Sequence, residues 1–208
     1  YNFLFFNLNN LSGRGLTAVE ARQEWFRELE FRRAISEAVD REAIARLVYQ
    51  GRATPIGGPV TAGNRLWRLP DIAPPERSLE RARQRLAEAG FALDADGDLR
   101  DPRGESVSFS IVTNSSNRQR IEIAAILQED LRQLGITVQV APIEFQSLVR
   151  RVLETRDFDA CILGLGGGDV DPNSSISVWL SSGGRHLWAP NQPEPATDWE
   201  AESDDLMT

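Results

Sequence analysis

The chain has 208 residues, of which 41% are hydrophobic and 26% are charged, a composition typical of a folded globular protein rather than a disordered one. Its formal net charge of −8 argues against a nucleic-acid partner, because nucleic-acid affinity comes mainly from cations that neutralise phosphates. No apolar run reaches the ~20 residues that a membrane-spanning helix needs, and no export signal opens the chain. The lone Cys161 excludes an internal disulfide.

The first part of the chain predicts one strand followed by helices. Residues 1–7 form an aromatic and aliphatic run, which indicates a buried strand. Apolar residues then recur at helical spacing from about Ala18, and Asp40 has the character of an N-cap for a further helix that Gly51 ends. Residues 52–76 are rich in glycine and proline and have no period, which predicts a long loop of the kind that is often functional.

The second part predicts alternating strands and helices. Ser78 caps a helix that stops at Gly90, and a hairpin follows whose second strand runs from about Val107 to Thr113. The next elements, in order, are a helix from Asn117 to Leu134, a strand at ITVQVAPIE, a helix near FQSLVRRVLETR and an apolar strand at FDACILGL. This alternation predicts an α/β layered domain. The chain then closes on WEAESDDLMT, which indicates the opening of a helix, and both chain ends suggest a piece of a longer protein.

A glycine-rich loop, LGLGGGDVDP, follows the last predicted strand. A phosphate loop of the G-x-x-x-x-G-K-[ST] type is impossible without lysine, and Asp169 and Asp171 would repel a phosphate. Ligands of open α/β sheets gather beyond the carboxyl ends of strands. We therefore expect Gly166, Gly167 and Gly168 to let a ligand or a facing lobe approach the main chain, with a flexible turn as the alternative.

An acidic stretch has the spacing of a calcium loop. Asp94, Asp96, Asp98 and Glu105 occupy four of the ligand positions of an EF-hand, but Leu99 stands where that loop requires glycine. A strand follows where a helix should, so a hairpin with a solvated acidic turn is favoured.

His186 is the only histidine, and no nucleophile motif accompanies it, so the sequence predicts neither a catalytic triad nor an enzyme. Trp67, Trp179 and Trp188 lie in loop-like contexts. They are either buried anchors or, for Trp67 and Trp188 above all, platforms on which a ligand stacks.

Four segments carry a resemblance to a known family. They are, in order, YNFLFFNLNN, FRRAISEAVDREAIARLVYQGRATPIGGPV, IAAILQEDLRQLGITVQV and RDFDACILGLGGGDVDP. Together they resemble the extracytoplasmic solute-binding proteins of family 5, the oligopeptide-, dipeptide- and nickel-binding receptors of ABC importers. The likeness runs from residue 1 to about residue 182.

The resemblance implies one lobe of a two-lobed receptor, similar to periplasmic binding proteins of type II, with a central mixed sheet flanked by helices. Residues 1–183 would form the second lobe, and residues 184–208 an extended tail leading back towards a first lobe outside this chain. Such a receptor captures a peptide or related small solute between its lobes and delivers it to the transmembrane subunits of an ABC permease. The resemblance implies an extracytoplasmic monomer without a cofactor.

The resemblance also implies a ligand-contacting loop. In peptide-binding relatives an aspartate of this loop pairs with the peptide's amino terminus, and the matching position here is Gly168, with Asp169 beside it. Either Asp169 takes over the ammonium group, or the ligand has no such amine. Main-chain contacts from Leu165 to Gly168 are expected in both cases.

Arg118, at the start of the long helix, falls where such relatives can face a ligand carboxylate, and a solvated surface arginine is the alternative. The alternative to a receptor is an α/β enzyme domain that uses the glycine-rich loop with Asp169 and Asp171 around a metal or phosphate. Peptides, nickel and sugars all occur as ligands in the family, so the sequence leaves the solute open.

Overall fold

A computed structural model describes residues 1–69, 71–166 and 171–208. Its main sheet has four strands in the order β1-β6-β4-β5. Strand β1 pairs antiparallel with β6, whereas β4 is parallel to both β6 and β5. The bounds are Asn2–Phe6 for β1, Ser108–Asn114 for β4, Thr137–Ile143 for β5 and Ala160–Gly164 for β6. The α/β class and the mixed sheet are thereby confirmed.

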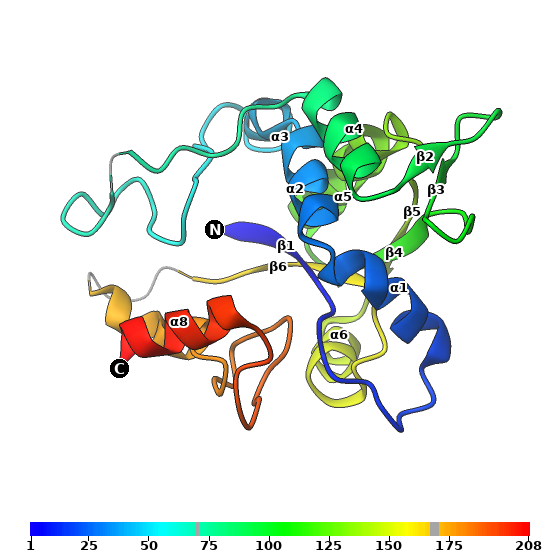
Figure 1. Cartoon of the computed structure of the whole chain (residues 1–208). Coiled ribbons are helices and arrows are strands. Elements are labelled where there is room, and N and C mark those ends of the chain that lie inside the picture. Colours follow the sequence, from blue (N-terminus) through cyan, green and yellow to red (C-terminus); the bar gives the residue numbers. More distant parts are fainter. Residues whose placement is uncertain (70, 167–170) are drawn as a thin grey trace.

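Helices cover both faces of this sheet (Figure 1). One face packs on α1 (Thr17–Arg27), α2 (Leu29–Ala38), α4 (Leu79–Glu88) and α5 (Arg118–Arg132). The other packs on α6 (Phe145–Arg150) and the π-helical turn that continues it over Arg151–Thr155. Because side chains alternate along a strand, neighbouring Phe5 and Phe6 of β1 enter the two cores separately. Among the described residues, no helix is long and apolar enough to cross a membrane.

The predicted hairpin is partly wrong. Its strands are β2 (Ala92–Leu93) and β3 (Leu99–Arg100), whereas the stretch assigned to its second strand belongs to β4 of the main sheet. The chain turns back earlier because the Asp94 carboxylate accepts hydrogen bonds from the backbone N–H groups of Asp96 and Asp98. Arg100 also pairs with Asp94, whereas Asp96 and Asp98 are exposed, as a hairpin with a solvated acidic turn predicts.

The last part of the chain is mostly irregular until its final helix. A 3₁₀ turn (Pro172–Ser175) leads into α7 (Ile176–Trp179), and α8 (Asp198–Met207) packs beside α7. The helix predicted at the end of the chain is therefore confirmed. Figure 1 shows α8, in red, lying on the far side of β1 from the long loop that precedes α4.

A buried polar network fixes the point at which β1 leaves the sheet. The Asn7 side chain is fully buried, and its Nδ2 donates to the carbonyl oxygens of Arg156 and Phe158 at 2.8 and 2.7 Å. Its Oδ1 accepts from Asn9 and Gln23. The Asn7 amide therefore has partners for both its donor and its acceptor, and it ties β1 to the segment before β6 and to α1.

We expect Asn7→Ala to destabilise the fold by about 2–4 kcal/mol, because it removes the side-chain donor of the Arg156 and Phe158 carbonyls and the acceptor that Asn9 and Gln23 share. Urea unfolding followed by circular dichroism measures the change. Asn10→Ala, at an exposed position three residues on, is the matched control and should shift the midpoint little. Equal effects of the two substitutions would contradict this role for Asn7.

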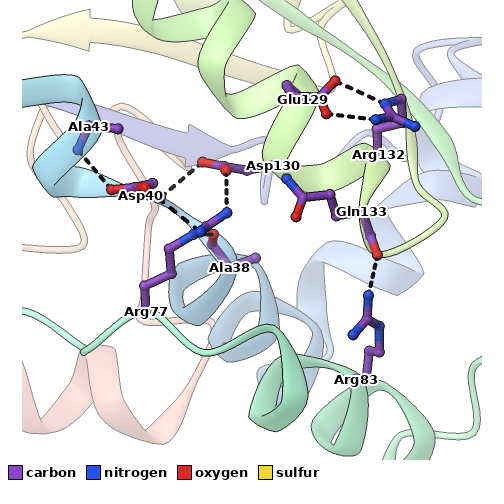
Figure 2. Close-up of polar contacts among 9 residues, drawn as sticks. All are labelled: Ala38, Asp40, Ala43, Arg77, Arg83, Glu129, Asp130, Arg132 and Gln133. Atoms are coloured by element: carbon purple, nitrogen blue, oxygen red, sulfur yellow. Dashed lines mark hydrogen bonds and ion pairs between the residues drawn. The ribbon is translucent and has the colours of Figure 1, made fainter. Parts of the chain in front are cut away.

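The long loop is confirmed: between α3 (Arg41–Leu47) and α4, the described residues form no helix or strand. Its end is anchored by Arg77, which donates to Asp130 at 2.8 Å and to the Ala38 carbonyl at 3.1 Å (Figure 2). The buried Asp130 carboxylate also accepts the backbone N–H of Asp40 at 2.9 Å. One carboxylate thus ties the loop to α5 and to the junction of α2 and α3.

Arg77→Ala should lower the free energy of unfolding by about 1–3 kcal/mol, because it strands a buried carboxylate, although the partly exposed guanidinium moderates the loss. Figure 2 also shows the matched control, Arg132, which pairs with Glu129 in solvent. Arg132→Ala should cost less than about 0.5 kcal/mol. Chemical denaturation of both variants measures the difference, and a smaller loss for Arg77→Ala than for Arg132→Ala would refute the anchor.

Candidate functional site

The ends of three neighbouring strands meet at one edge of the sheet. Strand β4 ends at Asn114, β6 ends at Gly164, and the antiparallel β1 begins at Asn2, which lies opposite Gly164. This is the carboxyl edge of the parallel strands, where ligands of open α/β sheets gather. This edge therefore carries the side-chain amides of Asn2 and Asn114 beside Gly164, which has no side chain.

Arg120 holds this edge together. Its Nε donates to Asn2 Oδ1 at 2.9 Å, and its Nη1 donates to Asn114 Oδ1 at 2.8 Å. Asn2 in turn donates to the Tyr49 hydroxyl. A Cβ atom at Gly164 would lie 2.5 Å from both Arg120 Nη2 and Asn2 Oδ1, so only glycine allows the guanidinium to approach this closely. Sequence reasoning missed Arg120, although polar residues at strand ends were a usable signal.

The predicted Arg118 points elsewhere. Its side chain is 91% exposed and pairs with Glu122 at 2.7 Å, one turn along α5. The helix begins at Arg118 because the Asn117 side chain caps it by accepting the backbone N–H of Arg120. In this arrangement Arg118 faces solvent while Arg120 faces the strand ends.

The glycine-rich loop is described in part. The Leu165 N–H donates to the Tyr1 carbonyl oxygen, and the Leu165 carbonyl oxygen accepts from the Tyr1 amino group, so the main chain of Leu165 is already engaged. A Cβ at Gly166 would meet no atom of the described residues within 4 Å, so none of those residues covers this backbone. Asp171 is exposed and accepts the backbone N–H of Asn173, capping the following turn. Gly167, Gly168 and Asp169 lie outside the described residues.

A cleft of about 1100 Å³ adjoins β1. Its walls come from β1, α2, the loop around residues 53–62 and a group of tryptophans, namely Trp179, Trp188 and Trp199. The described residues that line it include no carboxylate, and its charged members are Arg32 and Arg41. Burial lowers the pKa of both guanidinium groups, which are hydrogen-bonded to backbone carbonyls and to the Ser36 hydroxyl.

The two tryptophans singled out by sequence are not brought together. Trp67 is 48% exposed in the long loop and is not among the residues that line the cleft. Trp188 is partly buried in the cleft wall, with its ring centroid 6.0 Å from that of Trp179 and 6.4 Å from that of Trp199. The Leu8 N–H donates to the Trp188 carbonyl at 2.8 Å, which fixes this wall against the end of β1.

Trp179, Trp188 and Trp199 together form what we call the tryptophan wall of the cleft. The buried carboxylate of Glu200 organises the segment that carries this wall. Its Oε1 accepts from Gln192 Nε2 at 2.9 Å and lies at hydrogen-bonding distance, 3.1 Å, from His186 Nε2. Its Oε2 accepts from the Ala196 N–H and the Thr197 hydroxyl. Burial raises the pKa of Glu200, but the hydrogen bonds from Gln192, Thr197 and His186 outweigh it and hold the pKa below its ordinary value. The carboxylate is therefore charged at neutral pH.

Folding lowers the pKa of Glu200. The charged carboxylate therefore contributes fully to the free energy of unfolding at neutral pH, and this contribution is lost as the pH falls through the pKa of the folded state. We expect Glu200→Gln to lower the free energy of unfolding by about 2–3 kcal/mol at pH 7. The difference in stability between the variant and the native chain should become smaller below about pH 4. Urea unfolding at pH 7 and below about pH 4 measures this difference, and Glu202→Gln, at an exposed position, is the control. A gap independent of pH would contradict the charged state of Glu200.

The enzyme alternative gains no support. Within the described ranges, no group of three or more His, Cys, Asp or Glu side chains is placed to hold a metal ion. The Asp169 that this alternative requires lies outside those ranges. His186 is buried and committed to hydrogen bonds within the chain.

Comparison with known proteins places this geometry in a family. Residues 1–186 match the model for bacterial extracellular solute-binding proteins, family 5, middle region. The chain is 31% identical over 193 residues to the oligopeptide-binding protein AppA of Bacillus subtilis, covering 89% of this chain and 33% of that protein. It is 29% identical over 160 residues to heme-binding protein A of Haemophilus influenzae, covering 76% of this chain and 27% of that protein.

Solved structures of related binding proteins also match the fold of this chain. The structure of B. subtilis AppA in complex with a nonapeptide matches with a TM-score of 0.71 at 27% identity, covering 100% of this chain and 38% of that one. NikZ from Campylobacter jejuni in complex with Ni(L-His) matches with a TM-score of 0.74 at 21% identity, covering 100% and 42%, which shows the shared fold. The chain spans about a third of the length of the curated relatives it matches.

Proposed function

We propose that this chain, which belongs to family 5 of the bacterial extracellular solute-binding proteins, forms the second lobe of a two-lobed receptor that captures a peptide or related small solute for an ABC permease. Residues 1–183 would make up the lobe, and residues 184–208 would lead on towards the first lobe. The receptor would work outside the cytoplasm as a monomer and without enzymatic activity. The oligopeptide-binding name of the relative in B. subtilis supports a peptide as the ligand.

The observation that carries this proposal is the open carboxyl edge of the sheet. Asn2, Asn114 and Arg120 form a rigid polar group there, and none of the described residues covers the Gly166 backbone. A lobe that closed over this edge would bury the ligand between two surfaces, as hinge closure does in binding proteins. Main-chain groups would supply much of the recognition, and apolar pockets would tolerate varied side chains.

Individual residues have proposed parts in this site. Because the main chain of Leu165 is engaged by Tyr1, the proposed main-chain contacts with a ligand are those of Gly166, Gly167 and Gly168. Asp169 and Asp171 would meet a ligand ammonium group, if the ligand has one. The Trp188 ring would form an apolar wall for side chains.

Two arginines are candidates for a ligand carboxylate. Arg118 would have to leave Glu122 and turn inward, whereas Arg120 already stands at the edge. The exposed Trp67 would contact a ligand only if the first lobe brought it there.

Ligand capture can be tested without knowing the solute in advance. Mass spectrometry of the full receptor after gentle purification should detect a co-purified peptide or small solute. A thermal-shift series with nonapeptides, nucleotides and divalent cations then separates the receptor from the enzyme alternative. Stabilisation by nucleotides alone would overturn the receptor function, whereas stabilisation by a divalent cation alone would overturn a peptide as its ligand.

We expect Gly166→Leu in the full receptor to weaken binding of a stabilising nonapeptide at least about tenfold, because the new side chain fills space that the ligand needs. Folding should be unaffected, since a Cβ at this position meets nothing within 4 Å. Isothermal titration calorimetry measures the affinity. Gly63→Leu, at another glycine with open space, is the matched control. Unchanged affinity would show that the ligand does not approach residue 166.

A further inference from the structure

Another cavity lies away from the candidate ligand site. It has a volume of about 490 Å³ and is lined by the loop that joins β1 to α1 and by the stretch from Ser147 to Asp157. Figure 1 shows α6 beside the chain that leads from β1 to α1. Because Arg14, Arg150 and Arg151 line this cavity, we call it the arginine groove.

The arginine groove is at the opposite end of the strands from the candidate ligand site. Its first segment follows the end of β1, and its second segment precedes the start of β6 at Ala160. The candidate site lies where β1 begins, at Asn2, and where β6 ends, at Gly164. A ligand in the groove would therefore be separate from a solute at the carboxyl edge of the sheet.

Positive charge gathers in the arginine groove although the chain as a whole has a net charge of −8. Asp157 is the one carboxylate among the described residues of the lining, so the positive charges exceed the negative charge by two. Outside the lining, Glu154 lies 3.7 Å from Arg150 Nε, with the two side chains 70% and 73% exposed. An ion pair so exposed to solvent neutralises little of this charge.

The guanidinium groups of the groove keep most of their donors for an external partner. Arg14 Nη1 donates to the Glu154 carbonyl oxygen at 3.1 Å. The Arg151 side chain has no hydrogen bond or ion pair with the residues that the structure describes. Each guanidinium has five N–H donors in a planar fork that matches the oxygens of an anion.

A fourth arginine adjoins this group. Arg156 follows the π-helical turn with a φ of 59°, and its Nε is buried with no hydrogen-bond partner among the described residues. Burial, and in addition the positive charge of Arg14, lower the pKa of Arg156. The two guanidinium groups therefore repel one another, and a bound anion would relieve that repulsion.

The π-helical turn also brings a hydroxyl group into the groove. Thr155 belongs to the lining together with Arg151, and its Oγ1 makes only a long hydrogen bond of 3.4 Å to the Arg151 carbonyl oxygen. Single π-helical turns are frequent at functional sites. Arginine forks together with a hydroxyl donor are the groups with which proteins hold phosphate oxygens.

We propose that the arginine groove binds a phosphate group, with Arg14 and Arg151 as its main donors. The phosphate belongs either to a soluble anion or to the headgroup of an anionic lipid. A phosphate has enough free oxygens to accept from both guanidinium groups and from Thr155, whereas a carboxylate fills a single fork. The proposal is independent of the proposed function, because the groove and the candidate site share no residue.

The first test measures binding of inorganic phosphate to the full receptor by isothermal titration calorimetry at low ionic strength, where charges are least screened. We expect Arg14→Gln and Arg151→Gln each to weaken binding at least about fivefold. Arg151→Gln removes no bond within the described residues, so its folding should be unchanged. Arg132→Gln, at an exposed arginine that pairs with Glu129, is the matched control and should bind as the native receptor does.

The second test distinguishes the two sources of phosphate. The native receptor and the same variants are sedimented with vesicles of phosphatidylglycerol and phosphatidylcholine in equal parts, and with vesicles of phosphatidylcholine alone. Binding to the anionic vesicles that Arg14→Gln and Arg151→Gln reduce, and that Arg132→Gln does not, identifies a lipid headgroup. Binding of inorganic phosphate with the same dependence, without binding to vesicles, identifies a soluble anion.

Two results would overturn the proposal. One is that neither inorganic phosphate nor the anionic vesicles bind to the native receptor. The other is that binding is equally strong in Arg14→Gln, Arg151→Gln and Arg132→Gln, since the phosphate would then lie elsewhere on the surface. Neither test includes the solute, so a failure of the proposed function leaves both results unchanged.

Discussion

The antiparallel pairing of β1 with β6 is the constraint on which the rest of the molecule depends. It joins segments about 160 residues apart in the sequence, from Asn2 opposite Gly164 to Phe6 opposite Ala160. Asn7 closes this ladder with a fully buried side chain bonded to both neighbouring segments. Immediately beyond it, the Leu8 N–H holds the Trp188 carbonyl. One strand therefore sets the polar edge of the sheet at its first residue and the tryptophan wall at its far end.

Charge is distributed unevenly around this strand. The chain is acidic overall, yet the buried Asp130 and Asp159 are bonded to arginines and backbone amides within the fold. Asp159 bonds to Arg22 and to Ser110, and Asp130 bonds to Arg77. These pairs use the planar guanidinium, which can donate to several oxygens at once. The described cleft lining is mainly apolar and contains no carboxylate, and ligand pockets in proteins are typically lined by apolar and aromatic side chains.

Periodicity in the sequence was sufficient for the fold, because the strands and the long helix carry regular apolar patterns. Periodicity did not predict which of Arg118 and Arg120 faces the strand ends. Side chains two residues apart on a helix differ by about 200° in direction, and the direction of each depends on where the Asn117 cap starts the first turn. The hairpin was misassigned because side-chain bonds of Asp94, and no hydrophobic pattern, decide where it turns.

The Glu200 cluster was invisible to sequence reasoning for a related reason. Its partners are a ring nitrogen, a side-chain amide, a backbone N–H and a hydroxyl, all from an irregular stretch without any period. Only their convergence in space identifies them. The same holds for His186, whose sequence context gives no sign of the two oxygens that face it.

The cleft has two walls formed mainly by irregular chain, and each of them is held by a buried carboxylate near one end. The long loop is held by Asp130 through Arg77, and the segment from Trp179 to Trp199 is held by Glu200. The entropy of closing a loop grows only slowly with its length, by about 0.6 kcal/mol for each doubling. A segment anchored in this way can change in length and composition at small cost to the sheet and its helices. The fold thus separates the sheet and its helices from the two irregular walls of the cleft.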